Sequence, residues 1–361
     1  MNQEATRLGE SRGGTPWKKW GPYLSERQWG TVREDYSDSG DAWNYFNHDQ
    51  ARSRAYAWGE DGIAGISDDQ QILCFAIALW NEADPILKER MFGLSNAEGN
   101  HGEDCKEYYY YLDATPTYSY MKYLYKYPQR AYPYEDLVQV NGRRDRRDLE
   151  YELVDTGVFD ESRYFDVQVE YAKQSAEELF ARITVFNRGP QRATLHVLPT
   201  LWFRNTWQGR PDRLKPRLRE MRIHGGTRIA AADATLGDVF LTCDRRAPAI
   251  FTENETNTQR LFGTPNATAY VKDGINDFVV HGAPTVNPEK VGTKAAVHHR
   301  LEIPPGGAEV IRLRLGRRSR LRPSSGASQS GPTDGFGPSF DDLIEQRRRE
   351  ADDFYAAITP P

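Results

Sequence analysis

The 361-residue chain contains little cysteine. Its three cysteines, Cys74, Cys105 and Cys243, lie far apart in the sequence. An odd and sparse set favours a reducing compartment and argues against a disulfide framework or a zinc knuckle. We therefore expect a cytoplasmic protein, in which the glycosylation sequons at Asn254 and Asn266 are not used.

Long apolar runs are missing too. The longest, "ILCFAIALW" at 72–80, has the length of a strand and falls short of the roughly 20 residues of a membrane helix. The polar N-terminus has no signal-peptide core. The absence of a membrane-length apolar run argues against a membrane partner, and because the formal net charge is only −5, no nucleic-acid partner is expected. Phosphate-binding glycine loops, dinucleotide turns and nucleophile elbows are absent, so no cofactor is expected.

Aromatic residues are abundant, at 12% of the chain with 8 Trp and 20 Tyr. One explanation is a large β-sheet core, because aromatic side chains suit strands and their burial is strongly stabilising. The other is a carbohydrate site, where flat rings stack on the apolar faces of sugars. Both explanations stay open at this point.

The pattern of the chain is mainly β. Residues 72–80 predict a strand buried on both faces, and "EYYYYL" at 107–112 predicts a strand with tyrosines on alternate sides. From 149 to 315, alternating runs are separated by Gly and Pro, which predicts a large antiparallel β-sandwich with a few short helices. Within 117–140, the spacing of Met121, Leu124 and Tyr125 predicts a helix that Pro128 ends. "PYEDLVQVN" predicts a second, with Pro133 in its first turn.

Three segments are expected. Residues 1–315 form the sandwich domain with long N-terminal loops, 316–338 a flexible Ser-, Gly-, Pro- and Arg-rich linker, and 339–361 an amphipathic helix. The basic cluster of the linker lacks interleaved aromatics, so a solvated connection is expected there. The helix could dock on the sandwich or begin a helical domain that this chain does not contain. The linker before it favours the second alternative.

Three polar clusters could carry chemistry: residues 20–37, 48–62 and 98–104. Paired carboxylates could serve a glycosidase, but neighbouring Glu-Asp pairs point apart on a strand, and nearby Arg would keep them ionised. Arg–carboxylate bracing of the loops is the alternative. A metal site at 101–104 matches no established ligand spacing, and a Cys105–His101 nucleophile lacks an orienting group. The candidate substrate-binding residues are Trp29, Arg33, Glu34, Arg52, Trp58, Glu60, Asp61, Asn100, His101, Glu103 and Asp104.

Long strings of the sequence resemble a known family. They include "WGPYLSERQWGTVREDYS", "ARSRAYAWGEDGIAGISDDQQILCFAIALWN", "DPILKERMFGLSNAEGNHGEDCKEYYYYLDATPT", "LPTLWFRNTW" and "FTENETNTQRLFG". The chain resembles the N-terminal region of bacterial glucosidase-like proteins of glycoside hydrolase family 63, the family of mannosyl-oligosaccharide glucosidase. Asn47, Gln50 and Ala57 depart from the Pro, His and Arg that are typical of the family.

The resemblance implies a two-part design: an N-terminal β-sandwich, or super-sandwich, followed by an (α/α)6 barrel that holds the acid and base carboxylates. The chain ends where that barrel would begin, so no catalytic residue, metal or cofactor is assigned to it. It is expected to be an inactive, non-catalytic domain that supports the barrel and contacts an oligosaccharide. One alternative is a stand-alone carbohydrate-binding module that uses the Trp- and Tyr-rich surface. Another is a complete small enzyme with its site in the acidic clusters.

Overall fold

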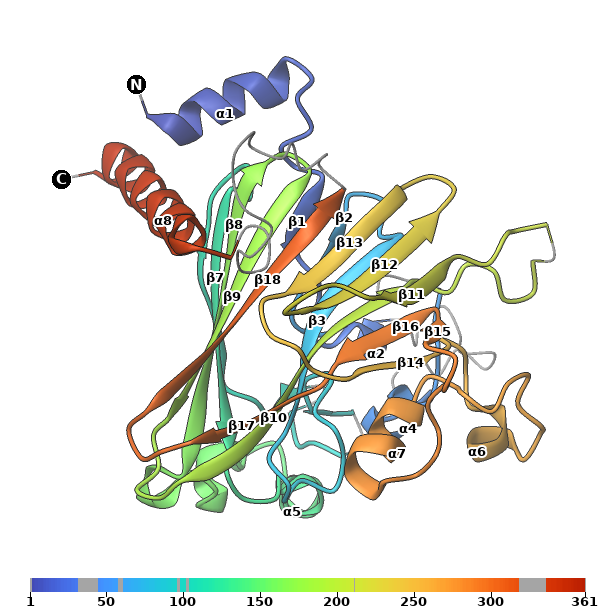
Figure 1. The fold of residues 1–361 in the computed structure, drawn as a ribbon. Coiled ribbons are helices and arrows are strands. Elements are labelled where there is room, and N and C mark those ends of the chain that lie inside the picture. Colours follow the sequence, from blue (N-terminus) through green and yellow to red (C-terminus); the bar gives the residue numbers. More distant parts are fainter. Residues whose placement is uncertain are drawn as a thin grey trace.

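The computed structural model describes residues 2–31, 45–57, 61–95, 98–101, 104–210, 212–317 and 336–360. Two large antiparallel sheets dominate it, with short helices at the periphery (Figure 1). The predicted mainly-β sandwich is confirmed. Among the described residues, no helix combines the length and the apolar character needed to cross a bilayer.

One sheet has seven strands among the described residues. In the order of their pairing these are β1 (Trp20–Tyr23), β2 (Ile63–Asp68), β3 (Leu73–Trp80), β10 (Ala193–Phe203), β16 (Lys294–Val297) and β14 (Ala249–Thr252), with β17 (His299–Ile303) also paired to β10.

The other sheet has nine strands in the described part of the chain. Their order is β15 (Val291–Gly292), β11 (Arg217–Met221), β12 (Thr227–Asp233), β13 (Gly237–Cys243), β18 (Ala308–Arg317), β9 (Glu178–Asn187), β8 (Tyr164–Ser175), β7 (Tyr120–Pro128) and β6 (Tyr109–Ala114). A separate small ladder pairs β4 (Gly93–Leu94) with β5 (Asp104–Cys105).

The helices are short, except for the last. They are α1 (Gln3–Arg12), α2 (Gln28–Thr31), α4 (His48–Ala51), α5 (Tyr134–Asn141), α6 (Thr258–Phe262), α7 (Gly274–His281) and α8 (Pro338–Ile358), with 3-10 turns η2 (Leu153–Thr156) and η3 (Asp160–Ser162). α5 lies where the sequence predicts it, with Pro133 at its N-cap.

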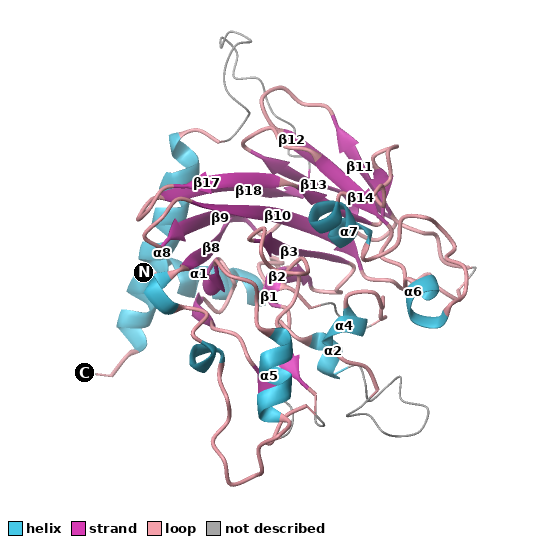
Figure 2. Ribbon diagram, turned by 90° about the horizontal axis from the view of Figure 1, so that it is seen from below, coloured by secondary structure: helices cyan, strands magenta, loops and turns pink. Residues whose placement is uncertain are grey.

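The main core fills the space between the two sheets. Phe165, Val167, Val169 and Tyr171 of β8 are all fully buried there, as their alternation predicts. β3 is buried on both faces, as predicted. Its outward residues pack under α7, which lies over the seven-stranded sheet (Figure 2). This sheet is therefore an internal layer, and any site on its outer face is built against a rigid, water-poor floor.

The helix predicted around Met121 is wrong. Residues 120–128 form β7, which pairs along its whole length with β8. Met121, Tyr123, Tyr125 and Tyr127 are fully buried on the core side. Their period of two, with the preference of aromatic side chains for strands, outweighs a helical spacing that only three residues share.

The C-terminal helix docks on the sandwich in this structure. Phe340 stacks on Phe180 of β9, with ring centroids 4.9 Å apart, and Ile344 and Ala351 are fully buried in the same cluster. The predicted linker lies mostly outside the described residues, and its first two positions still belong to β18. The helix is thus docked on the sandwich, which is the alternative that the preceding linker disfavoured.

Polar contacts join α1, α8 and the end of the nine-stranded sheet. Glu4 is fully buried and accepts hydrogen bonds from the backbone and hydroxyl of Thr117, at 2.7 and 2.6 Å. Arg7 of α1 binds Glu350 of α8. Beneath them, the Lys173 ammonium is fully buried and donates to backbone carbonyls, including that of Trp20 at 2.6 Å.

The buried Lys173 predicts a pH dependence of stability. Burial lowers its pKa from 10.5 to about 7, whereas the unfolded chain keeps the ordinary value. Between these values the unfolded state binds one more proton, so the free energy of unfolding rises with pH. Relative to Lys173→Met, the parent protein should gain roughly 1.4 kcal/mol per pH unit from pH 7 to 10. Urea unfolding of both proteins at pH 7, 8 and 9 measures this difference. A difference that does not change with pH would show that Lys173 stays charged in the fold.

Candidate functional site

Several predicted site residues lie outside the described residues. These are Arg33, Glu34, Trp58, Glu60 and Glu103. The remaining six, Trp29, Arg52, Asp61, Asn100, His101 and Asp104, fall into separate surroundings. The structure therefore does not bring the described candidates together at one point.

Trp29 of α2 is fully buried. Its ring packs in a small cluster with Phe46 and Tyr56, and the guanidinium of Arg27 lies 5.3 Å from the ring centre. A ring with no exposed area has no free face for a sugar. In this structure it supports the loops around α4.

Arg52 braces a loop through Asp49, whose carboxylate it binds at 3.0 Å. Asp49 also binds Arg260 of α6 at 2.6 Å. Burial raises the pKa of Asp49, but hydrogen bonds from Arg260 and Arg52 outweigh this and lower it. This is the Arg–carboxylate bracing that the sequence offered as an alternative to catalysis.

Asp61 belongs to a buried charged cavity on the outer face of the seven-stranded sheet. It is 5% exposed, accepts a hydrogen bond from the Tyr56 hydroxyl at 2.6 Å and lies 3.4 Å from the Arg90 guanidinium. Glu89, Lys272 and Lys294 line the same cavity, which has a volume of ≈ 20 Å³. That is room for about one water molecule.

The charges of this cavity are tightly paired. Glu89 binds Lys294 and lies 3.7 Å from Arg90. Burial opposes ionisation of Glu89, but Lys294 and Arg90 outweigh it and lower the pKa. Trp202 of β10 is also part of the lining, and its indole N–H has no partner among the described residues. The cavity can hold a small polar group, but an ionised carboxylate cannot act there as a proton donor.

The third cluster lies elsewhere. Asn100 and His101 bind the carbonyl of Asp148, at 3.1 and 2.9 Å. The carboxylates of Asp104, Glu150 and Glu152 are close enough together to hold a metal ion, but all three contact the Lys106 ammonium. Desolvation opposes the charge of Lys106, yet the hydrogen bonds that its ammonium donates to Asp104, Glu150 and Glu152 outweigh this and raise its pKa. The lysine thus supplies the cation that these carboxylates need.

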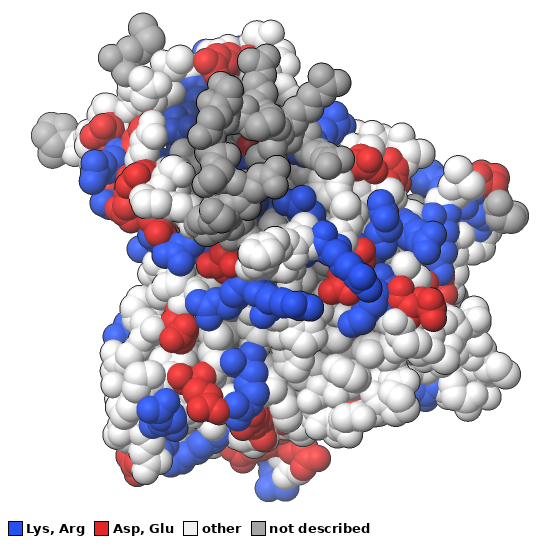
Figure 3. All heavy atoms as spheres, in the orientation of Figure 1, with Lys and Arg blue, Asp and Glu red and all other residues white. Residues whose placement is uncertain are grey.

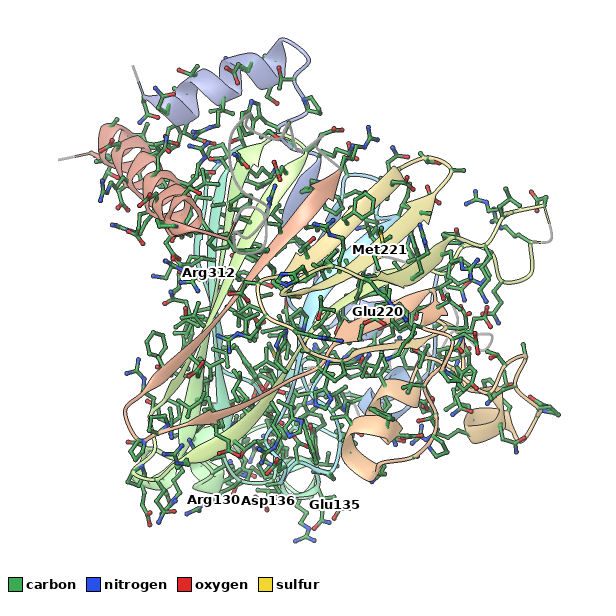
Figure 4. The ribbon with its side chains drawn as sticks, in the orientation of Figure 1. Arg130, Glu135, Asp136, Glu220, Met221 and Arg312 are labelled. Carbon is green, nitrogen blue, oxygen red and sulfur yellow. The ribbon has the colours of Figure 1, made fainter. Side chains whose placement is uncertain are left out.

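A larger groove, which the sequence did not single out, lies at the α5 end of the molecule. Its volume is ≈ 830 Å³. Figure 4 places Glu135 and Asp136 at this end, below the sheets. Apolar and aromatic residues line it together with four acids: Ala83, Pro85, Ile86, Phe92, Tyr132, Pro133, Tyr134 and Val138, with Asp49, Glu98, Glu135 and Asp136.

A buried ion pair fixes the floor of this groove. Lys88 and Glu107 are both fully buried, 2.7 Å apart, and the Lys88 ammonium lies 3.6 Å from the centre of the Tyr132 ring. His48 stacks on Tyr134, with ring centroids 5.7 Å apart. Burial, and then the charges of Lys88, Arg90 and Arg52, lower the pKa of His48, so the imidazole is neutral at pH 7.

One carboxyl near the groove, that of Asp84, has a raised pKa. Burial raises the pKa of Asp84 from 3.8 to about 6. However, Asp84 is 2% exposed and accepts a hydrogen bond from the Tyr127 hydroxyl at 2.9 Å. The Asp84 carboxyl is therefore enclosed in the core and does not reach a ligand in the groove.

Most of the groove residues come from two segments, 83–92 and 131–139, which several strands separate along the chain; the others come from residues 47–49 and from Glu98. The second segment is aromatic, with Tyr132 and Tyr134 flanking Pro133, whereas the first has one proline and no tyrosine and lies mostly within a string that resembles the family. The composition of the second segment was a usable signal. The pairing of the two segments depends on Lys88 and Glu107, which no local pattern connects.

Charges of both signs are mixed on the face drawn in Figure 3, without a field of one sign. This agrees with the modest net charge of −5. The acidic groove is therefore a local feature.

No family model matches the chain. A Saccharomyces cerevisiae protein, described only as uncharacterized, is 40% identical over 393 residues, which cover 99% of this chain and 36% of that protein. The chain thus spans 36% of the length of the curated relative it matches.

Two solved structures are similar in part. A protein described as a kojibiose phosphorylase from the human microbiome is 9% identical, with 53% of this chain and 22% of that chain covered and a TM-score of 0.27. A protein described as an aldose 1-epimerase from Escherichia coli K12 is 7% identical, with 58% and 67% covered and a TM-score of 0.27. At these scores the similarity carries no conclusion about this chain.

The charged cavity can be tested through its buried ion pair. Lys294→Met should lower the free energy of unfolding by about 3–5 kcal/mol, because it leaves Glu89 buried with less compensation. Adding Glu89→Gln should recover part of the loss. Urea unfolding of the parent, both single variants and the double variant measures the coupling. As a control, Arg348→Gln removes the exposed partner of Asp352 and should change little. Strictly additive effects would contradict the assignment of a coupled pair.

Proposed function

We propose that the chain is the non-catalytic β-sandwich domain of a glycoside hydrolase. The enzyme is a family 63-like glucosidase that acts on α-glucosides or oligosaccharides, and the domain supports and walls the active site of a helical barrel in the same polypeptide. The family resemblance of the long sequence strings supports this. So does the match to 36% of a longer relative, since a domain of a larger protein is expected to align in this way.

The observation that carries the proposal is the groove beside α5. At ≈ 830 Å³ it lies within the usual range of ligand sites, roughly 300–1,000 Å³. Tyr134 and Pro133 offer apolar surface, while Glu135 and Asp136 are exposed at the rim. Ring faces beside carboxylates suit a sugar, which has an apolar face and hydroxyl groups that donate hydrogen bonds.

The described groove residues support binding rather than hydrolysis. Glycoside hydrolysis needs one protonated and one ionised carboxyl on opposite sides of the scissile bond. Asp49 at the groove is held ionised by two arginines, and Asp84, whose pKa is raised, is buried away from it. A catalytic pair supplied by the barrel is consistent with both facts.

The domain boundaries and partners belong to the same proposal. The sandwich domain extends to Arg317 at the end of β18, the predicted linker follows it, and α8 (Pro338–Ile358) is a helix that leads into the barrel. Because α8 is packed on the nine-stranded sheet through Phe340 and Ile344, it can hold the following domain in a defined orientation. The oligosaccharide and the barrel are the expected partners.

The chain alone should not hydrolyse glycosides. We expect no release of glucose above buffer from 4-nitrophenyl α-glucoside or from glucose-containing oligosaccharides, because Asp84, the carboxyl near the groove whose pKa is raised, is buried away from it and Asp49 is held ionised. A coupled glucose assay at pH 5, 6 and 7 on protein of verified mass measures this. Turnover that Glu60→Gln or Glu103→Gln abolishes would instead support a complete small enzyme with its site in the acidic clusters.

A second candidate function is a stand-alone carbohydrate-binding module, favoured by the aromatic groove itself. It predicts saturable binding of an α-gluco-oligosaccharide by the isolated chain, measured by titration calorimetry. The pair Glu135→Gln and Asp136→Asn should weaken it roughly tenfold, since two hydrogen bonds to carboxylates become weaker.

The matched control for this titration replaces two exposed acids of α8, with Asp352→Asn and Asp353→Asn. It removes the same charge and should leave the affinity unchanged. Equal weakening by both pairs would show a charge effect without a groove site. An absence of heat with every glycan tested would remove the stand-alone module as a candidate.

A further inference from the structure

A second pocket of ≈ 460 Å³ adjoins the groove. It is lined by Asn81, Glu82, Gln129 and Arg130, and the groove continues directly from Ala83 and Ala131. Arg130 projects at the same end of the molecule as Glu135 and Asp136 (Figure 4). The same two segments therefore contribute to both linings, which differ in charge.

Three arginines line this pocket: Arg130, Arg163 and Arg192. Arg163 is paired with Glu161 at 2.7 Å. Arg130 and Arg192 are exposed and have no side-chain partner among the described residues. Two guanidinium groups are thus left without a counter-charge in one concavity.

The backbone that carries the arginines is firmly held. The buried amide of Asn81 donates to the carbonyl of Arg130 at 2.9 Å, and the buried amide of Asn187 donates to the carbonyl of Gln191, next to Arg192, at 2.7 Å. The backbone N–H of Gln129 donates to the carbonyl of Arg163 at 2.9 Å. The backbone positions of the three residues are therefore set before a ligand arrives, which lowers the entropic cost of ordering the chain on binding.

Two lining residues have a left-handed backbone that side chains other than glycine rarely adopt. Glu82 has φ 63° and Glu161 has φ 59°, and Ser162 follows with φ 57°. Such conformations cost free energy and concentrate at functional sites. Here both glutamates are engaged by cations: Glu82 by Arg300 at 3.0 Å, and Glu161 by Arg163. The acids of the pocket thus do not neutralise Arg130 or Arg192.

We propose that this pocket binds the phosphate group of a small phosphorylated sugar through Arg130 and Arg192. Guanidinium groups bind phosphate oxygens in paired hydrogen bonds, and two unpaired guanidinium groups match the two charges of a phosphate monoester. The hydroxyl of Thr194 and the amide of Gln191 lie in the same lining and can contact sugar hydroxyls. The sugar part rests on the proposed function of the neighbouring groove, whereas the phosphate part rests on this pocket alone.

Titration calorimetry at low salt tests the proposal with glucose 6-phosphate, inorganic phosphate, gluconate and glucose. We expect glucose 6-phosphate to bind best, inorganic phosphate more weakly and glucose not at all. Arg130→Gln with Arg192→Gln should weaken glucose 6-phosphate about tenfold or more, because charge-assisted hydrogen bonds are lost. The control, Arg219→Gln with Arg222→Gln, removes the same charge from exposed positions around β11 and should leave the affinity unchanged.

Three results would overturn the proposal: no heat with either phosphate, equal weakening by the control pair, or gluconate binding as well as glucose 6-phosphate. If inorganic phosphate binds as tightly as glucose 6-phosphate, the pocket recognises phosphate and the sugar part fails. None of these measurements includes hydrolysis. The pocket and the glycoside hydrolase role can therefore fail independently.

Discussion

The buried ion pair between Lys88 and Glu107 connects most of what lies at the α5 end. Glu107 accepts hydrogen bonds from Lys88, from the backbone of Phe92 at 2.9 Å and from the Tyr125 hydroxyl at 2.8 Å. The free-energy cost of taking both charges out of water is offset only when the remaining hydrogen-bonding groups of the pair are also satisfied in this way. The pair therefore fixes the 81–92 loop against the sheet. This loop contributes residues to the walls of both the groove and the arginine-lined pocket, so both walls depend on the pair.

Much of the sandwich could be predicted from local pattern. The strand at 72–80 and the alternating strand at 165–171 were correct, because burial on one or both faces leaves a direct trace in the order of apolar residues. At 107–112, Tyr109 and Tyr111 both reach Glu26, while Tyr110 stands on the opposite face. The prediction of a helix around Met121 was wrong, because the pairing with β8 is a long-range contact that a short stretch of sequence does not contain.

The candidate site, too, depends on long-range contacts that the local sequence does not reveal. Asp61 was singled out, but Lys272 and Lys294, which give its cavity its charge, come from more than 200 positions later in the chain. Trp29 was chosen for its ring, and only the fold reveals that the ring is covered. Neither the groove nor the arginine pocket has a motif, since each is assembled from segments that meet only after the sheets form.

The contacts between α1 and α8 place the two ends of the chain beside each other at one edge of the sandwich (Figure 1). A unit whose ends meet can be joined to another polypeptide through a single patch of surface, without rerouting any strand.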